Sequence, residues 1–177
     1  MKKLLVLLFS LGLTACMTLS PDPKLLTQTQ NTSSIVEQGY QLETDINPKI
    51  EKQLTGGGIK QLVHKTLEVG LSQANIFASK KPEQYKIKAY IEKASQQAGM
   101  SLGRFRGVMI IHYTVTDPNG KTILDKEIET VKGSDKWSIF GAERHMRSRI
   151  VNSAENVNQF IAELDKTLKA SKAKKSK

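Results

Sequence analysis

The stretch VMIIHYTVTDPNGKTILDKEIETV, residues 108–131, decides the fold of this chain. Two runs rich in apolar and β-branched residues flank the tetrapeptide DPNG at 117–120. Proline suits the second position of a type I turn, and glycine suits the left-handed position that follows it. The pattern therefore predicts an antiparallel hairpin with strands over 108–116 and 122–131. The first arm is apolar on both faces for part of its length, which indicates a central strand.

Two further strands and one helix are predicted upstream of the hairpin. Residues 35–43 and 85–92 alternate apolar with polar side chains, the second range more regularly than the first. Between them, apolar residues recur every three or four positions over 59–78, which predicts a helix with one face on the sheet. The connection over 45–58 contains three glycines but lacks the lysine and hydroxyl residue of a phosphate-binding loop, so we expect a flexible lead-in to the helix.

A long helix is expected at the end of the folded region. It begins between Ser134 and Gly141 and ends near Leu168, which makes it about 40 Å long and able to cross the whole sheet. Its apolar face comprises Met146, Ile150, Val157, Phe160, Ile161, Leu164 and Leu168. The predicted fold class is α+β, with a small antiparallel sheet of about four strands packed by two helices, of which the C-terminal one is long.

The first sixteen residues, MKKLLVLLFSLGLTAC, have the organisation of a secretory signal. Two lysines precede an apolar run over 4–13 that is too short to cross a bilayer as a helix. The run ends in LTAC, and Cys16 is the only cysteine of the chain. A single cysteine in an exported protein calls for an explanation, because it cannot form an internal disulfide. One alternative is an ordinary signal followed by a structural cysteine.

The LTAC sequence resembles the lipobox of bacterial lipoproteins. This resemblance implies that residues 1–15 are removed, that Cys16 receives a diacylglyceryl thioether, and that its new amino group is acylated, for example with palmitate. In such lipoproteins the residue after the cysteine helps to choose the membrane. Met17 is not the aspartate associated with inner-membrane retention, so the resemblance implies an outer-membrane anchor with the domain facing the periplasm.

The chain is expected to have four segments. Residues 1–15 are the signal peptide, and residues 16–34 are an acylated cysteine with a solvated tether rich in Thr, Ser, Gln and Pro. Residues 35–168 form the α+β domain, and residues 169–177 form a disordered basic tail. Each boundary follows a change in composition.

The chain is basic, with 27 Lys and Arg, 17 Asp and Glu, and a formal net charge of +10. Removal of the signal would lower the net charge to about +8. In a cytosolic protein this balance would suggest nucleic acid. An exported lipoprotein meets anionic lipids and cell-wall polymer instead, so we expect no nucleic-acid partner. The expected partners are the membrane, through the anchor on Cys16, and an envelope protein, a lipid or peptidoglycan.

The sequence predicts no catalytic residues, no metal site and no cofactor. The three histidines, His64, His112 and His145, have no cysteine or second histidine at a ligand spacing. We expect His64 to be solvated and His112 to be a hydrogen-bonded structural residue of a core strand. Alternate carboxylates occur at 125, 127 and 129, and these are expected to pair with lysines at 86 and 88 across strands rather than to perform acid and base chemistry.

Candidate partner-binding residues occur where the last strand meets the final helix. Trp137 is the only tryptophan, and Arg144 and Arg147 follow one to two turns into the helix. Tryptophan and arginine dominate the energetics of protein interfaces. The alternative is that Trp137 covers the open end of the core with Ser138 as the helix cap, while the arginines form a solvated basic face.

The order of the predicted elements, strand, helix, three strands and long helix, stands behind a lipobox and a polar tether. This arrangement is similar to that of small α+β periplasmic lipoproteins of Gram-negative envelopes, which include the lipopolysaccharide-assembly lipoprotein, auxiliary lipoproteins of ABC transporters and uncharacterised families. The resemblance covers about residues 35–168 and implies binding rather than catalysis. We therefore expect a non-enzymatic accessory or binding component of the envelope; the alternatives are a structural anchor contacting peptidoglycan and an envelope hydrolase.

Overall fold

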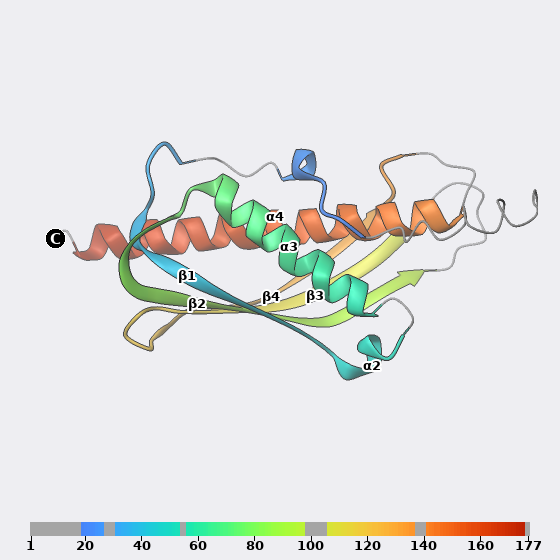
Figure 1. The fold of residues 1–177 in the computed structure, drawn as a ribbon, viewed down its shortest axis with the longest axis horizontal. Coiled ribbons are helices and arrows are strands. Elements are labelled where there is room, and N and C mark those ends of the chain that lie inside the picture. The colour runs from blue at the N-terminus through green and yellow to red at the C-terminus, as the bar shows by residue number, and fades with distance from the viewer. Residues whose placement is uncertain (1–18, 27–30, 54–55, 98–105, 137–140, 176–177) are drawn as a thin grey trace, which may run out of the picture.

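The computed structural model describes residues 19–26, 31–53, 56–97, 106–136 and 141–175 (Figure 1). The elements follow in the order η1 (Pro23–Leu25), β1 (Val36–Ile46), α2 (Pro48–Glu51), α3 (Gly56–Ala74), β2 (Phe77–Gln97), β3 (Arg106–Thr116), β4 (Thr122–Gly133) and α4 (Gly141–Lys175). The four strands form one sheet in the order β1-β2-β3-β4. Both α3 and α4 lie on the same face of this sheet. The α+β class, the four strands and the long C-terminal helix are confirmed.

The β3–β4 hairpin forms as the DPNG sequence predicts. Asp117 Oδ1 accepts hydrogen bonds from the backbone N–H groups of Asn119 and Lys121, both at 2.9 Å. Gly120 has a φ of +83°, the left-handed conformation that an L side chain rarely adopts. β3 pairs with β2 on one side and with β4 on the other, so it is a central strand.

The sheet is mixed rather than antiparallel throughout, which differs from the expected arrangement. β1 runs parallel to β2, whereas the other two strand pairs are antiparallel. The reason is the helix between them: α3 carries the chain back to the end of the sheet where β1 began, so that β2 runs in the same direction as β1. Alternation of side chains reveals a strand but not the direction of its neighbour.

The boundary between α3 and β2 also differs from the expected one. The predicted helix over 59–78 ends at Ala74, and Phe77 begins β2 rather than facing the sheet from the helix. Asn75 terminates the helix because it adopts a left-handed conformation with a φ of 50°. In β2, the Phe77 ring then packs against Tyr40 and Tyr85, with ring centroids 4.9 and 5.6 Å away.

The core lies between the sheet and the two long helices. Tyr113 of β3 stacks on Phe160 of α4, with ring centroids 4.1 Å apart and both residues fully buried. The second half of the predicted apolar face of α4 is confirmed, because Val157, Phe160, Ile161, Leu164 and Leu168 are buried. The first half of the buried face is polar, and it comprises Ser148, Asn152, Ser153 and Asn156.

Two buried asparagines fasten α4 to the hairpin. Asn156 Nδ2 donates to the Ile128 carbonyl at 2.8 Å, and its Oδ1 accepts from the Tyr113 hydroxyl at 2.8 Å. Asn152 Nδ2 donates to the carbonyls of Gly107 and Lys132 at 3.0 and 2.9 Å, and its Oδ1 accepts from Lys132 N–H at 2.9 Å. A Cβ atom at Gly107 would lie 2.8 Å from Asn152 Nδ2, so the close approach requires glycine.

Parts of the segment that was expected to be a solvated tether pack on the domain. Leu26 belongs to the core, and Leu25 packs against that core. Asn31 and Ser34 cap the end of α3, where the Asn31 side chain donates to the Ala74 carbonyl at 2.9 Å and Ser34 Oγ donates to Asn75 Oδ1 at 3.0 Å. The physical reason is that the carbonyls at the end of α3 need partners and the two leucines gain free energy by burial.

The first part of the tail that was expected to be disordered is instead helical. α4 continues to Lys175, so residues 169–175 are helical. Alanine and lysine are strong helix formers, and adding turns to a helix that has already formed costs little. Lys172 Nζ lies 3.5 Å from the Ile35 carbonyl and thus connects this end of α4 with the start of β1.

Replacement of Asn156 by Leu should lower the free energy of unfolding by about 2–4 kcal/mol, because it leaves the buried Tyr113 hydroxyl and Ile128 carbonyl without partners. Tyr113→Phe should cost about 1 kcal/mol. Urea unfolding of both single variants and of the double variant measures the coupling between them. A double variant whose loss equals the sum of the single losses would contradict the hydrogen bond.

Candidate functional site

Arg147, in the second turn of α4, holds together three separate parts of the chain. Its Nε and Nη2 donate to the two carboxylate oxygens of Asp135 at 2.5 and 2.6 Å. Its Nη1 donates to Asp22 Oδ2 at 2.7 Å. Only 14% of the Arg147 side chain is exposed. The guanidinium therefore joins the N-terminal segment, the connection after β4, and the start of α4.

The charges of this ion-pair cluster stabilise one another. Hydrogen bonding to Arg147 lowers the pKa of Asp22 and the pKa of Asp135. The hydrogen bond to Asp135, followed by the one to Asp22, raises the pKa of Arg147. Both carboxylates consequently stay ionised well into the acidic range.

Through its contacts, Asp22 holds the N-terminal segment next to Arg147. Its Oδ1 accepts from Lys24 N–H at 3.1 Å and thereby caps the short helix η1. Asn158 Nδ2 of α4 donates to the Leu25 carbonyl at 2.8 Å, next to the point where Leu26 enters the core. Residues 22–26 are thus fixed along α4 by one ion pair, one backbone contact and two leucine side chains.

The structure brings together only part of the site that the sequence suggests. Arg147 does not lie on an outer basic face as expected, because its guanidinium faces Asp22 and Asp135; Arg144 is half-buried in the preceding turn. Trp137 and Ser138 lie outside the described residues, and so does Cys16. The roles of Trp137, Arg144 and Arg147 in partner binding, and of Cys16 in acylation, therefore remain predictions.

Sequence analysis missed both carboxylates of this cluster. The Asp22-Pro23 pair is a helix-start signal, so the cap at Asp22 was detectable. No local pattern indicates that Asp22 contacts a residue 125 positions away. The contact is therefore a result of the tertiary fold alone.

Several cations gather at the end of the domain where α4 begins. Arg149 lines a small hollow with Ala94, Ser95, Gly107, Val108, Met109 and Asn152, where β2 ends and β3 begins. Burial lowers the pKa of Arg149, and burial together with the charges of Arg149 and Arg144 lowers the pKa of His145. Among the residues that the structure describes, no carboxylate pairs with Arg149.

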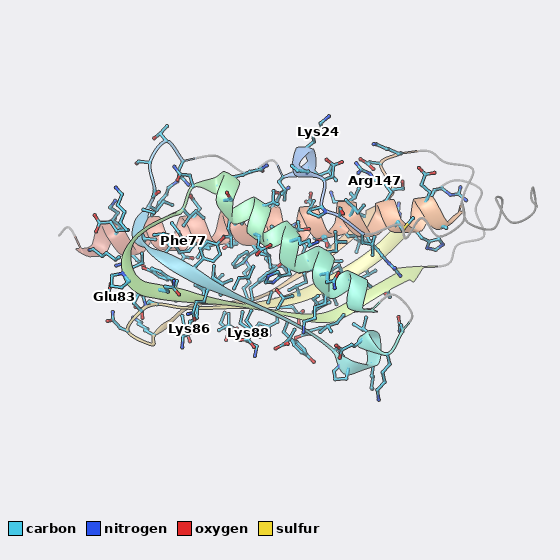
Figure 2. The ribbon with its side chains drawn as sticks, in the orientation of Figure 1. Lys24, Phe77, Glu83, Lys86, Lys88 and Arg147 are labelled. Carbon is cyan, nitrogen blue, oxygen red and sulfur yellow. The ribbon has the colours of Figure 1, made fainter. Side chains whose placement is uncertain are left out.

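A cleft of about 600 Å³ lies at the opposite end of the domain. It forms between the start of β1, the first half of β2, the β3–β4 turn and the last turns of α4. Its lining comprises Ile35, Val36, Glu37, Gln38, Lys81, Glu83, Tyr85, Asp117, Pro118, Asn119, Leu168, Ser171 and Lys172. Figure 2 shows Glu83 of this cleft and Arg147 in opposite halves of the molecule along its long axis. Within the cleft, Lys81 Nζ and Glu37 Oε2 form an ion pair at 2.6 Å.

The face of the sheet that α3 and α4 leave uncovered carries charged side chains, such as Lys86 and Lys88 in Figure 2. The expected pairing of these lysines with the carboxylates of β4 is wrong for Lys88, which lies 3.6 Å from Glu43 and from Asp45 on β1. β3 separates β2 from β4, so strand order explains the difference.

His112 lies on this uncovered face rather than in the core. Its Nε2 is hydrogen-bonded to Asp125 of β4, and its Nδ1 lies 3.6 Å from Glu92 of β2. The hydrogen bond to Asp125 is the main cause that raises the pKa of His112. Across the described ranges no group of three or more potential ligands could hold a metal ion, and no described helix has the length and apolarity to span a bilayer.

No protein-family model matches this sequence, and no curated protein does so either. A Xanthomonas campestris protein of the family DUF330 superposes with a TM-score of 0.53 at 10% identity, over 85% of this chain and 95% of that protein. A candidate lipoprotein from Caulobacter crescentus superposes with a TM-score of 0.45 at 14% identity, over 72% and 89%. A minor lipoprotein from Acinetobacter baumannii gives 0.38 at 10% identity, over 74% and 93%. At 10% identity, the similarity to the Xanthomonas campestris protein shows a shared fold and nothing about function.

Arg147→Gln should release residues 19–26 from α4, because it leaves Asp22 and Asp135 close together without the guanidinium that binds both of them. Trypsin should then cleave after Lys24 faster, and the free energy of unfolding should fall by about 1–3 kcal/mol. Arg106→Gln, at an exposed arginine, is the matched control. Equal cleavage rates in the two variants would contradict the anchoring role.

The same cluster should respond to acid. Because the pKa values of Asp22 and Asp135 are lowered in the folded state, their stabilisation is complete above about pH 4, the unfolded pKa, and is lost as the pH falls through the folded values. The Arg147→Gln variant should lack this acid-dependent part.

His112 should add a pH dependence of the opposite sign. Its folded pKa is raised, so the stabilisation is complete below about pH 6.5 and is lost as the pH rises through the folded value. His112→Gln should therefore lower the melting temperature in mildly acidic solution and have less effect in alkaline solution. His145 titrates in both proteins, so the difference between them isolates His112. Parallel profiles of melting temperature against pH would contradict this account.

Proposed function

We propose that this chain is a non-enzymatic lipoprotein of the outer membrane, held by acyl chains on Cys16 with its α+β domain in the periplasm. We further propose that the domain binds an envelope protein in the cleft at the C-terminal end of α4. The cleft is the observation that carries the binding function, and the LTAC sequence carries the anchor.

The size of the cleft supports a binding role. About 600 Å³ is within the range of pockets that hold ligands or short segments of a partner. Its walls come from four elements that are far apart in sequence, and hydrogen bonds fix two of them: the turn through Asp117 and the end of α4 through Lys172. A cleft that exists before binding costs a partner little ordering free energy.

The chemistry of the lining favours a segment of protein as the occupant. Ile35, Val36, Tyr85 and Leu168 supply apolar surface, while Glu83, Asp117 and Lys172 supply both signs of charge. A peptide also combines apolar groups, polar backbone and charges of both signs. A purely anionic glycan or phosphate would instead meet the carboxylates of the cleft.

The same lining supports binding rather than hydrolysis. Glu37 is engaged by Lys81, and this interaction lowers the pKa of Glu37, so this carboxylate is poorly suited to donate a proton. The similar proteins from Caulobacter and Acinetobacter are described as lipoproteins, and neither description names an enzyme.

A structural anchor that contacts peptidoglycan is the second candidate function. It is favoured by the last turns of α4, where Lys166, Lys169 and Lys172 are exposed beside the cleft. These lysines could meet the carboxylates of cell-wall peptides. This role is compatible with the same anchor and the same orientation of the domain.

Cys16→Ser should abolish palmitate labelling and release the protein from the membrane fraction, since the thioether requires the thiol. Stable anchoring requires more than one acyl chain. Because all of the proposed chains are attached at Cys16, loss of the cysteine should release nearly all of the protein. Separation of inner and outer membranes on a density gradient checks the location. Unchanged labelling and sedimentation of the variant would exclude acylation at Cys16.

A photo-crosslinking amino acid at Gln38, inside the cleft, should capture an envelope protein in intact cells. The matched control carries the same amino acid at Glu127, which is exposed on the uncovered face of the sheet. Ser171→Trp, which should fill part of the cleft, should reduce capture at Gln38 without lowering the melting temperature. Capture at Glu127 but not at Gln38 would place the partner elsewhere.

A further inference from the structure

The ion pair between Asp22 and Arg147 limits how far the domain can move from its anchor. This step rests on the proposed acylation of Cys16. Asp22 is the sixth residue after Cys16, and even a fully extended chain of that length spans only about 20 Å. The beginning of α4, where Arg147 lies, is therefore kept within about 20 Å of the membrane surface. A freely solvated tether up to residue 34 would have allowed about three times that distance.

The end of the domain that is held near the anchor is basic. Arg144 and Arg149 lie within one turn of Arg147 on α4. Lys136 follows Asp135, which binds Arg147, and Arg106 at the start of β3 pairs with Gly133 at the end of β4. We call Arg106, Lys136, Arg144 and Arg149 the basic end. Together with Arg147 these are five cations against the three carboxylates of Asp22, Asp135 and Glu143, so this end keeps a net charge of about +2, and Lys136 interacts electrostatically with both Asp22 and Asp135.

Arg149 indicates that the basic end suits an external anion. Its guanidinium is half-buried in the hollow beside Ser95 and Gly107, and within the described residues it has no carboxylate partner. Burial, and after it the charges of Arg149 and Arg144, lower the pKa of His145. Like charges crowded in this way gain free energy when an anionic surface approaches them.

We propose that the basic end docks on the anionic phospholipid headgroups of the membrane that holds the Cys16 acyl chains. The domain then stands with α4 directed away from the lipid. Leu168 of the cleft lies 21 residues beyond Arg147 on α4, so the cleft opens about 30 Å farther from the membrane. This orientation presents the cleft to a periplasmic partner rather than to lipid.

The lysine-rich last turns of α4 are the competing surface. They lie about 40 Å along the helix from Arg147, farther than the short segment after Cys16 can reach. They could touch the same membrane only if the domain lay flat. The two arrangements differ in which end of the domain approaches the lipid, and this difference can be measured.

The first test places a fluorophore at either end of the acylated protein. Because acylation consumes the only native cysteine, Ala142→Cys and Asn119→Cys each provide a single labelling site, at the start of α4 and at the cleft respectively. The proteins are reconstituted in phosphatidylcholine vesicles with and without phosphatidylglycerol, together with a headgroup-attached quencher. We expect phosphatidylglycerol to increase quenching at position 142 and not at 119. Equal quenching at both positions, or stronger quenching at 119, would overturn the proposal.

The second test uses the unacylated mature chain with Cys16→Ser, so its result does not depend on the anchor. Arg106→Gln with Lys136→Gln should weaken binding to phosphatidylglycerol vesicles about 25-fold, since each cation near an anionic leaflet contributes about fivefold. The matched control, Lys80→Gln with Lys166→Gln, removes two exposed charges from the cleft half of the domain and should cost less than about threefold.

Two results of this second test would overturn the docking proposal. One is an equal loss of binding in the control pair, which would mean that the whole surface contributes without a preferred end. The other is displacement from vesicles by inorganic phosphate at constant ionic strength, which would indicate a site for a small anion. Neither result bears on acylation, which the labelling of the Cys16→Ser variant decides separately.

Discussion

The rest of the structure depends on the hydrogen bonds that Asn152 and Asn156 make with the backbone of the hairpin. Hydrophobic burial is not directional, so an apolar face alone would hold α4 on the sheet but would leave its rotation and its position loosely defined. Buried amides allow one arrangement, because any other leaves polar groups without partners. That arrangement turns Arg147 toward Asp22 and Asp135 at one end of α4 and sets Leu168 and Lys172 into the cleft at the other.

The parts of the fold that sequence analysis predicted correctly are those that local chemistry specifies. The DPNG turn fixes the hairpin, because proline and glycine each favour one backbone conformation. Alternation identified β2 through Ile87, Ala89 and Ile91, which are all buried. The direction of β1 was not predictable in this way, since it follows from the path of α3. The polar start of the buried face of α4 was missed because asparagine and serine usually face water.

The candidate site was less predictable than the fold. The sequence indicated Arg147 as a candidate partner-binding residue because it is an arginine near a tryptophan. Its role in holding the N-terminal segment depends on Asp22, which is remote in sequence. The segment before β1 has the composition of a solvated linker, and composition cannot reveal that Leu25 and Leu26 find a surface to cover. The lysines after residue 168 suggested disorder, whereas their helical propensity and the preceding helix prevailed.

Under the proposed acylation of Cys16, the packing of residues 22–26 on the domain also has a mechanical consequence. Tension on the lipid anchor would act first on the Asp22–Arg147 ion pair and on the two leucines, before it reached any strand of the sheet. Once these contacts yield, the chain from Cys16 to Val36 could extend to roughly 70 Å, instead of the 20 Å or so allowed while they hold. The segment can therefore lengthen when the anchor is under force and pack on the domain again when the force falls. The domain would remain folded while the distance between membrane and partner changes.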